Sequence, residues 1–257
     1  MHWVPERWRN GCTIECMELS STHHVILNEK LGIVIKSSSK TNPNYPGFVR
    51  ERKANALLGR GVATIPGYLI TPYYGTNVNF TMSKLPAIIR ARSEVVGEAT
   101  GVYEQLRAIA SPTFISEERA TKVHKRCAAP ELADLADLYD RQVEKVGDVE
   151  PIGLCVGDFR TPNMCVSADG KITIIDLESL VVAPDYVDFS ALACDLWFHD
   201  NREVTQFLDE GLWNLDALRV IACSSVTHTA WVEGYDAAHI KLDRATKLLD
   251  YCGGTWA

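Results

Sequence analysis

Short apolar runs rich in β-branched residues mark the first third of the chain. These runs predict strands at residues 13–18, 25–27, 32–36, 68–70 and 79–82. Between them, apolar positions recur at helical spacing from Phe48 and stop at Gly59 and Gly61, which predicts one helix. The Pro-, Asn- and Gly-rich segment 40–47 predicts a loop. This part of the chain is therefore predicted to be small and rich in strands.

The remainder of the chain shows mainly helical spacing. We expect Pro86 to break the chain, and a helical stretch to follow over residues 88–109. Residues 113–150 read as a helical insertion, because Leu132, Leu135 and Leu138 recur at helical spacing. Three further helices are predicted over residues 189–251.

Two β features interrupt this helical part. The apolar run 152–156 predicts a strand, and residues 164–175 predict a hairpin whose turn ends in Gly170. We therefore predict an α+β chain with a small β-rich N-lobe, residues 1–84, and a larger helical C-lobe, residues 85–257.

Composition agrees with a folded protein. Hydrophobic residues make up 46% of the chain and charged residues 23%, which is ordinary globular usage. No apolar run approaches the roughly 18 residues that a membrane span needs, and Met1–Trp8 has no apolar signal region. The eight cysteines form no CxxC pair, so we expect free thiols in a reducing compartment, the cytoplasm.

Charge is distributed unevenly. Residues 1–130 hold 17 Lys and Arg against 10 Glu and no Asp, a net charge of +7, whereas residues 131–257 carry −14. Such asymmetry favours a polyanion on the first half and a cation or metal on the second. The alternative is that both halves are ordinary solvated surfaces.

The candidate chemistry lies in residues 157–178. Asp158 and Asn163 follow a predicted strand, and the predicted hairpin separates them from Asp176. That geometry is expected to return Asp176 close to Asn163. Two carboxylates and an amide oxygen are hard ligands that suit Mg²⁺. Phosphoryl transfer needs such a set and a carboxylate that accepts a hydroxyl proton.

This arrangement resembles the protein-kinase-like fold, in its aminoglycoside phosphotransferase and choline kinase branch, as a divergent member. The usual run of that branch, H-G-D-x-x-x-x-N, is similar to Val156–Asn163, and its I-D-W/L-E run is similar to Ile175–Glu178. Residues 188–192 look like its D-L-A segment, which begins a helix under the catalytic loop. The resemblance implies a bilobal fold and a transferase that uses ATP and Mg²⁺. Without it, Asp158 and Asn163 would be read as turn and cap residues.

The resemblance also implies roles for individual residues. Asp158 would be the catalytic base or would orient the hydroxyl, and Asn163 and Asp176 would hold the metal. Lys36 would contact nucleotide phosphates, with Glu51 on the following helix as its partner. The alternatives are a solvated Lys36 and a Glu51 that pairs with a basic neighbour on its own helix.

Two departures from the family pattern bear on the nucleotide. The expected phosphate-covering loop, residues 19–24, contains no glycine, so the hydroxyls of Ser20 and Ser21 would have to donate hydrogen bonds instead. Val156 stands where the family usually has the histidine that orients the catalytic loop. The glycine-free loop puts ATP and Mg²⁺ use in doubt, and both departures favour a repurposed kinase fold.

An acidic stripe is the candidate acceptor site. Asp134, Asp137 and Asp140 recur every three positions in the helical insertion. In the family this region lines the acceptor site, so Asp134 and Asp137 would receive a cationic small molecule. The alternative is a solvated helix face.

Three functions remain open. The first is an ATP- and Mg²⁺-dependent small-molecule phosphotransferase. The second is a repurposed kinase fold that uses aminoacyl-tRNA, such as an arginine-containing cyclodipeptide synthase, with tRNA bound by the basic first half. The third is a binding module that retains nucleotide affinity without catalysis.

Overall fold

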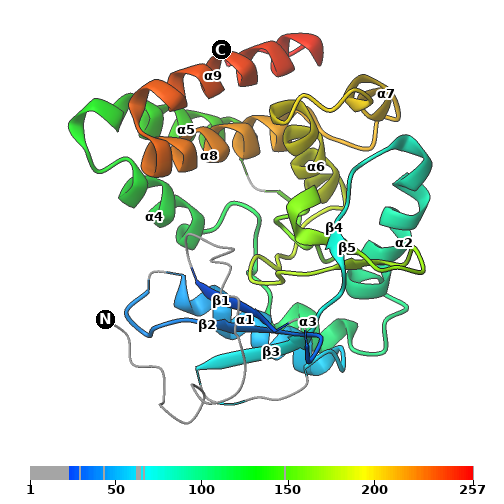
Figure 1. Ribbon diagram of the computed structural model, residues 1–257. Helices are drawn as coiled ribbons and strands as arrows, with labels where there is room; N and C mark the ends of the chain where they lie inside the picture. Colours follow the sequence, from blue (N-terminus) through cyan, green and yellow to red (C-terminus); the bar gives the residue numbers. More distant parts are fainter. Residues whose placement is uncertain are drawn as a thin grey trace. The chain divides into compact units, whose positions relative to one another are not determined.

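The computed structural model describes residues 23–28, 30–42, 44–61, 65, 67–147 and 149–256. Contacts between residues divide the chain after Tyr74 into two compact units, which we call the first unit (residues 1–74) and the second unit (residues 75–257). Figure 1 colours the elements of both units along the sequence. The strand expected at residues 13–18 and the loop residues Ser20 and Ser21 lie outside the described residues.

The first unit contains an antiparallel sheet and one helix. The sheet has the order β1 (His24–Asn28), β2 (Ile33–Ser37), β3 (Tyr68–Pro72). Helix α1 (Tyr45–Leu57) buries Phe48 and Ala54 completely. It begins three residues before the expected start at Phe48, because Pro46 lies in the first turn, where a missing backbone N–H costs no hydrogen bond.

The second unit begins with a second antiparallel sheet. Its strands are β4 (Thr76–Asn77), β5 (Met164–Val166) and β6 (Ile172–Ile174), so the expected hairpin at 164–175 is confirmed. The strand expected at residues 79–82 is wrong. Beyond Asn77 the backbone makes one more hydrogen bond to β5, from Val78 N to Met164 O, and Met164 is the first residue of β5. The lobe boundary expected after residue 84 stays a prediction, although β4 already pairs within the second unit.

Eight helices are described in the second unit: α2 (Leu85–Val96), α3 (Tyr103–Ile109), α4 (Glu117–Arg126), α5 (Ala133–Val146), α6 (Tyr186–Phe198), α7 (Val204–Asp209), α8 (Leu215–Glu233) and α9 (Tyr235–Tyr251). Helix α8 packs against α4, α5, α6 and α9, and Figure 1 shows it among them. A cluster of buried side chains around Phe114, Tyr139 and Val187 forms part of the core beneath these helices.

Three of the helical predictions need correction. The single helix expected over residues 88–109 is two helices, because α2 ends at Val96 and Gly97 leaves the helical conformation. Pro86 lies in the first turn of α2 and does not break the chain. The region 189–251 holds four helices where three were expected, since Asp200 adopts a positive φ of 53° and separates α6 from α7.

The strand expected at residues 152–156 is also wrong. Only Cys155 makes a β-bridge there, to Val181. Gly153 and Gly157 on either side have positive φ angles of 86° and 82°, which end an extended run. The order of elements nevertheless confirms the predicted α+β class, a small β-rich first part followed by a larger helical part.

Two sequence-based expectations concern the environment of the protein. Among the helices described, none combines the length and the apolar character that a bilayer crossing requires. The six cysteines that the structure describes are free, and five of them are buried. The cytoplasmic location itself stays a prediction.

Candidate active site

The carboxylate of Asp158 is held by two neighbours in the loop that follows Val156. Asn163 Nδ2 donates hydrogen bonds of 2.9 Å to both the side-chain Oδ2 and the backbone oxygen of Asp158. Arg160 Nε lies 2.8 Å from Asp158 Oδ1. The Asp158 side chain keeps 34% of its surface exposed. The carboxylate is thus fixed in orientation and still accessible.

Asp176 returns to this loop through the hairpin. The residue before it, Ile175, donates its backbone N–H to Asn163 O at 2.8 Å. Asp176 has a φ of 57°, a left-handed conformation that a non-glycine residue rarely adopts and that is often found at functional sites. The pKa of Arg160 is raised, first by Asp158 and further by the charge of Asp176. The structure therefore brings Asp158, Asn163 and Asp176 together at one end of the hairpin.

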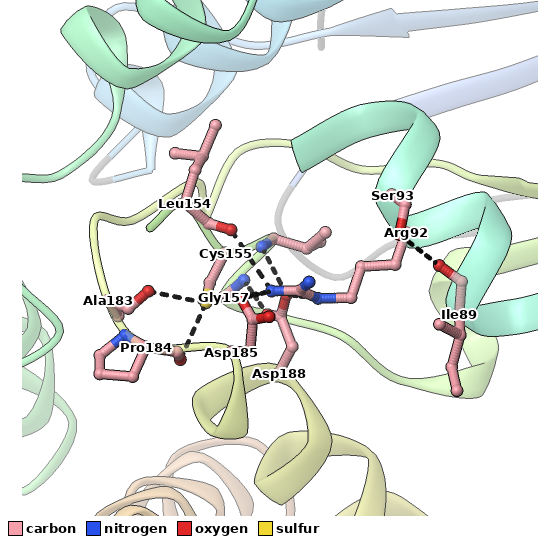
Figure 2. A network of polar contacts seen from close by, with 11 residues as sticks. Ile89, Arg92, Ser93, Leu154, Cys155, Gly157, Ala183, Pro184, Asp185 and Asp188 are labelled. Atoms are coloured by element: carbon pink, nitrogen blue, oxygen red, sulfur yellow. Dashed lines mark hydrogen bonds and ion pairs between the residues drawn. The ribbon is translucent and has the colours of Figure 1, made fainter. Parts of the chain in front are cut away.

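The start of the loop is anchored from beneath by an ion pair that the sequence only partly predicted. Asp188, in the first turn of α6, accepts hydrogen bonds from the backbone N–H groups of Val156 (3.0 Å) and Gly157 (2.8 Å). Arg92 of α2 places its Nε 2.7 Å from Asp188 and its Nη2 2.9 Å from Asp185. Figure 2 shows the Arg92 guanidinium between these two carboxylates.

This network is deeply buried. The Asp188 side chain has no exposed surface and Arg92 has 7%. Burial alone would lower the pKa of Arg92, but Asp188, Cys155 and Asp185 outweigh it, so the guanidinium pKa is raised and the group stays charged. The Arg92–Asp188 ion pair, together with the two backbone N–H groups that Asp188 accepts from, holds the start of the loop. At this point the family pattern has a histidine, and this chain has Val156.

Gly157 occupies a position that no other residue fits. Its φ is 82°, and a Cβ at this position would lie 2.0 Å from the backbone oxygen of Ser179. The loop therefore approaches the Ser179 backbone more closely than any side chain would allow.

Asp195 anchors the far end of the loop. Its Oδ2 accepts hydrogen bonds from Thr161 N (2.9 Å) and Thr161 Oγ1 (2.6 Å), and its Oδ1 lies 3.2 Å from His199 Nδ1. Because Asp188 and Asp195 both belong to α6, one helix fixes both ends of the loop.

Sequence reasoning missed Arg92, Asp195 and Arg160. A signal for Asp195 was present, because a lone carboxylate inside the apolar run Ala191–Leu196 needs a polar partner. Arg92 stands on the buried side of α2 and carried the same kind of signal.

The first unit contains the second group of predicted residues. Lys36 on β2 and Glu51 on α1 form an ion pair of 2.7 Å, with 11% and 6% of their side chains exposed. Glu51 therefore reaches across to β2, in addition to any contact on its own helix. That Lys36 binds phosphate stays a prediction.

The acidic stripe lies on the exposed face of α5. Asp134 and Asp137 are exposed, and Asp140 on the same face lies 3.1 Å from His124 Nε2 of α4. Their role towards an acceptor stays a prediction.

Comparisons with known proteins agree with this geometry. Residues 94–221 match the model of the phosphotransferase enzyme family. No curated protein matches the sequence. The choline kinase LicA from Streptococcus pneumoniae has a similar structure, with a TM-score of 0.58 and 14% identity over 93% of this chain and 93% of that one.

Two further solved structures are similar. A thermostable mutant of the aminoglycoside phosphotransferase APH(4)-Ia has a TM-score of 0.55 and 15% identity over 93% of this chain and 95% of that one. The amicoumacin kinase hAmiN, in complex with AMP-PNP, Ca²⁺ and amicoumacin, has a TM-score of 0.56 and 12% identity over 93% and 88%. This chain therefore has the protein-kinase-like fold of the aminoglycoside phosphotransferase and choline kinase branch.

Proposed function

We propose that this protein is an ATP- and Mg²⁺-dependent phosphotransferase that acts on the hydroxyl group of a small molecule. The observation that supports this most is the fixed position of Asp158 beside Asn163, on a loop that α6 anchors at both ends. A carboxylate that is oriented and accessible can accept a hydroxyl proton, which is the one protein group that phosphoryl transfer requires besides charge stabilisation.

The residues around Asp158 fit a divalent cation. Asn163 and Asp176 offer hard oxygen donors close to each other, and the left-handed backbone of Asp176 is the kind of local strain that a functional position can carry. Asn163 and Asp176 would hold Mg²⁺, and the bound nucleotide would supply the phosphoryl group. In the first unit, the buried pair of Lys36 and Glu51 fits a phosphate contact, with Glu51 fixing the ammonium group.

Within this proposal each residue has a distinct task. Asp158 orients the acceptor hydroxyl and accepts its proton. Arg160, whose Nε contacts Asp158, holds that carboxylate in place. Asp188 and Asp195 keep the loop from moving, which preserves the short distances that proton transfer needs.

Magnesium-dependent hydrolysis of ATP, with water as the acceptor, tests the proposal without knowledge of the natural acceptor. Asp158→Asn should lower the rate by at least about 100-fold, because general-base catalysis contributes about 10²–10⁴-fold. Circular dichroism should show that the variant folds. The matched control is Asp243→Asn on the exposed face of α9, which should hydrolyse ATP at the unaltered rate. Hydrolysis that is independent of Asp158 would contradict the proposal.

The aminoacyl-tRNA alternative remains the second candidate. Positive side chains of α4 lie near Asp158, which fits a phosphate-bearing partner as well as it fits a small anion. A titration with tRNA at several salt concentrations separates the two. Affinity that falls with a logarithmic slope of about 0.7–0.9 per phosphate contact would favour tRNA.

A further inference from the structure

Positive side chains from α4, the loop and α9 lie near one another, and three of them lie near Asp158. We call Arg119 and Arg126 of α4, Arg160 of the loop and Lys241 of α9 the cationic cluster. The charge of Asp158 acts on the pKa values of Arg119, Arg126 and Arg160, so these three lie within the range of its field. The charges of Asp158, Arg126, Arg160 and Lys241 all act on the pKa of His228 in α8. Asp158 therefore acts on three arginines and on His228, whereas Glu118 acts on Arg119, and Glu233 and Asp195 act on Lys241.

Three groups in or beside the cluster have depressed pKa values. Burial lowers the pKa of Arg126, and the neighbouring Arg119 and Arg160 lower it further. Burial also lowers the pKa of Lys241, with Arg160 adding to the effect. Burial, followed by the like charges of the cluster, lowers the pKa of His228 to about 4. Burial is the largest cause of all three depressed pKa values and like charge adds to it, so a bound anion would stabilise the charged forms of these groups.

Two of the other carboxylates near the cluster also make contacts outside it. Glu118 lies 3.2 Å from Lys122 on the same helix. Asp195 accepts hydrogen bonds from Thr161 and lies 3.2 Å from His199. These contacts leave Arg119 and Arg126 with no ion pair among the described residues.

Two buried polar groups beside the cluster lack hydrogen-bond partners among the described residues. They are Arg119 Nη1 and the hydroxyl of Tyr139, a completely buried side chain on α5. Tyr139 and Arg119 lie close enough for each to shift the pKa of the other. The guanidinium of Arg119 also lies 4.5 Å from the centre of the Phe114 ring. Buried donors without partners cost free energy, so they indicate a group that is bound during function.

We propose that the cationic cluster binds the anionic group, a carboxylate or a phosphate, of the small molecule whose hydroxyl Asp158 serves. Arg119 and Arg126 are the main recognition residues, since guanidinium groups donate paired hydrogen bonds to either oxyanion. The hydroxyl of Tyr139 donates one further hydrogen bond. The part of this inference that concerns the substrate hydroxyl rests on the proposed function. The anion site itself rests only on the residues of the cluster.

This substrate class differs from the cationic acceptor expected from Asp134 and Asp137. Those two carboxylates are exposed on α5, where water weakens their attraction for a cation. The cluster charges are partly buried and therefore attract an anion more strongly. The charges closest to Asp158 thus favour a hydroxy acid or a sugar phosphate over an amine.

Isothermal titration calorimetry with inorganic phosphate, D-glycerate and choline tests the proposal. Each compound is titrated into the nucleotide-free protein and into protein saturated with Mg–AMP-PNP. Phosphate or D-glycerate should bind in both states, and choline should bind in neither. A carboxylate site would prefer D-glycerate, and a phosphate site would prefer inorganic phosphate.

Variants assign the binding to the cluster. Arg119→Gln and Arg126→Gln should each weaken phosphate binding at least tenfold, and Tyr139→Phe should weaken it about threefold. Arg90→Gln, an exposed arginine on α2, is the matched control and should change the affinity less than twofold. Melting temperatures show which variants are folded, and Arg126→Gln, at a partly exposed position, keeps the test valid if Arg119→Gln does not fold.

Three results would overturn the inference. They are phosphate affinity that is unchanged in both arginine variants, choline binding in place of anion binding, and binding of tRNA without binding of either small anion. Failure of AMP-PNP to bind would contradict the proposed function instead. The nucleotide-free titrations still compare the variants, so the two failures are distinguishable.

Discussion

The arginines on the two sides of the loop at 157–163 differ in whether carboxylates pair with them. Beneath the loop, Arg92 is matched by Asp185 and Asp188, and the loop backbone supplies further donors. Beside Asp158, Arg119 and Arg126 both lie in the field of that carboxylate, and a buried Arg119 nitrogen has no hydrogen bond to the described residues. Both regions enclose arginines, but among the described residues only the first provides each with an ion pair.

The comparison separates structural charge from functional charge. A buried ion pair that is fully hydrogen-bonded fixes a conformation, and removing one partner is costly. A group of cations with too few carboxylates raises the free energy of the folded state. A bound anion lowers that free energy, so such a group binds anions more tightly. We therefore expect substitutions beneath the loop to affect folding and substitutions beside Asp158 to affect binding.

The largest effect is expected at Arg92. Arg92→Met leaves the Asp188 carboxylate buried without its cation, which should lower the free energy of unfolding by about 3–5 kcal/mol. Urea denaturation measures the change. Arg90→Met on the exposed side of the same helix is the control and should stay within about 0.5 kcal/mol. Equal stability of the two variants would break the comparison.

The next effect is expected at Gly157. Gly157→Ala forces a Cβ against Ser179 O and should destabilise the protein by about 3 kcal/mol. Gly170 has the same φ of 82° with open space around it, so Gly170→Ala should cost only about 1 kcal/mol. The difference between the two melting temperatures measures the close approach of the loop. If both variants melt alike, the loop can move away from Ser179.

A smaller effect depends on pH. The pKa of His228 is lowered from 6.5 to about 4 in the folded protein, so the unfolded state binds the proton first as the pH falls. Stability is then full above pH 6.5 and is lost progressively towards pH 4. His228→Gln should remove about 1–2 kcal/mol of the loss between pH 7 and pH 5. Urea denaturation at several pH values measures it, and identical pH profiles would mean that burial and the neighbouring cations do not disfavour the charged form of His228.

The smallest effect is expected for an exposed pair. Lys122 and Glu118 form an i, i+4 ion pair on α4 at 3.2 Å. Lys122→Ala should change the free energy of unfolding by about 0.3–0.5 kcal/mol, since water screens such pairs. A loss comparable with that of Arg92→Met would mean that α4 is held by charge and not by packing.

The hairpin and the two acidic residues on either side of it in the sequence, Asp158 and Asp176, were predictable because they depend on contacts between residues close in sequence. Turn residues fix the hairpin at 164–175, and the hairpin alone brings Asp176 back to Asn163. The pair of Lys36 and Glu51 was expected only from the resemblance, and the structure contains the contact.

What was missed depends on contacts between distant segments. Arg92 meets Asp188 across 96 positions of sequence, and Thr161 meets Asp195 across 34, so no local pattern records either contact. The strand expected at 152–156 failed because two left-handed glycines outweigh its apolar pattern. The cationic cluster joins α4, a loop and α9, and its arginines come from both the basic and the acidic half of the sequence.

The most direct test of the central claim is a calorimetric titration of the protein with ATP, with and without Mg²⁺. The account predicts that Mg²⁺ strengthens ATP binding. Asp176→Asn should reduce this Mg²⁺-dependent gain in affinity at least tenfold while the variant stays folded. ATP affinity that is the same with and without Mg²⁺, or the same in the variant, would contradict the claim that this fold retains a phosphotransferase site.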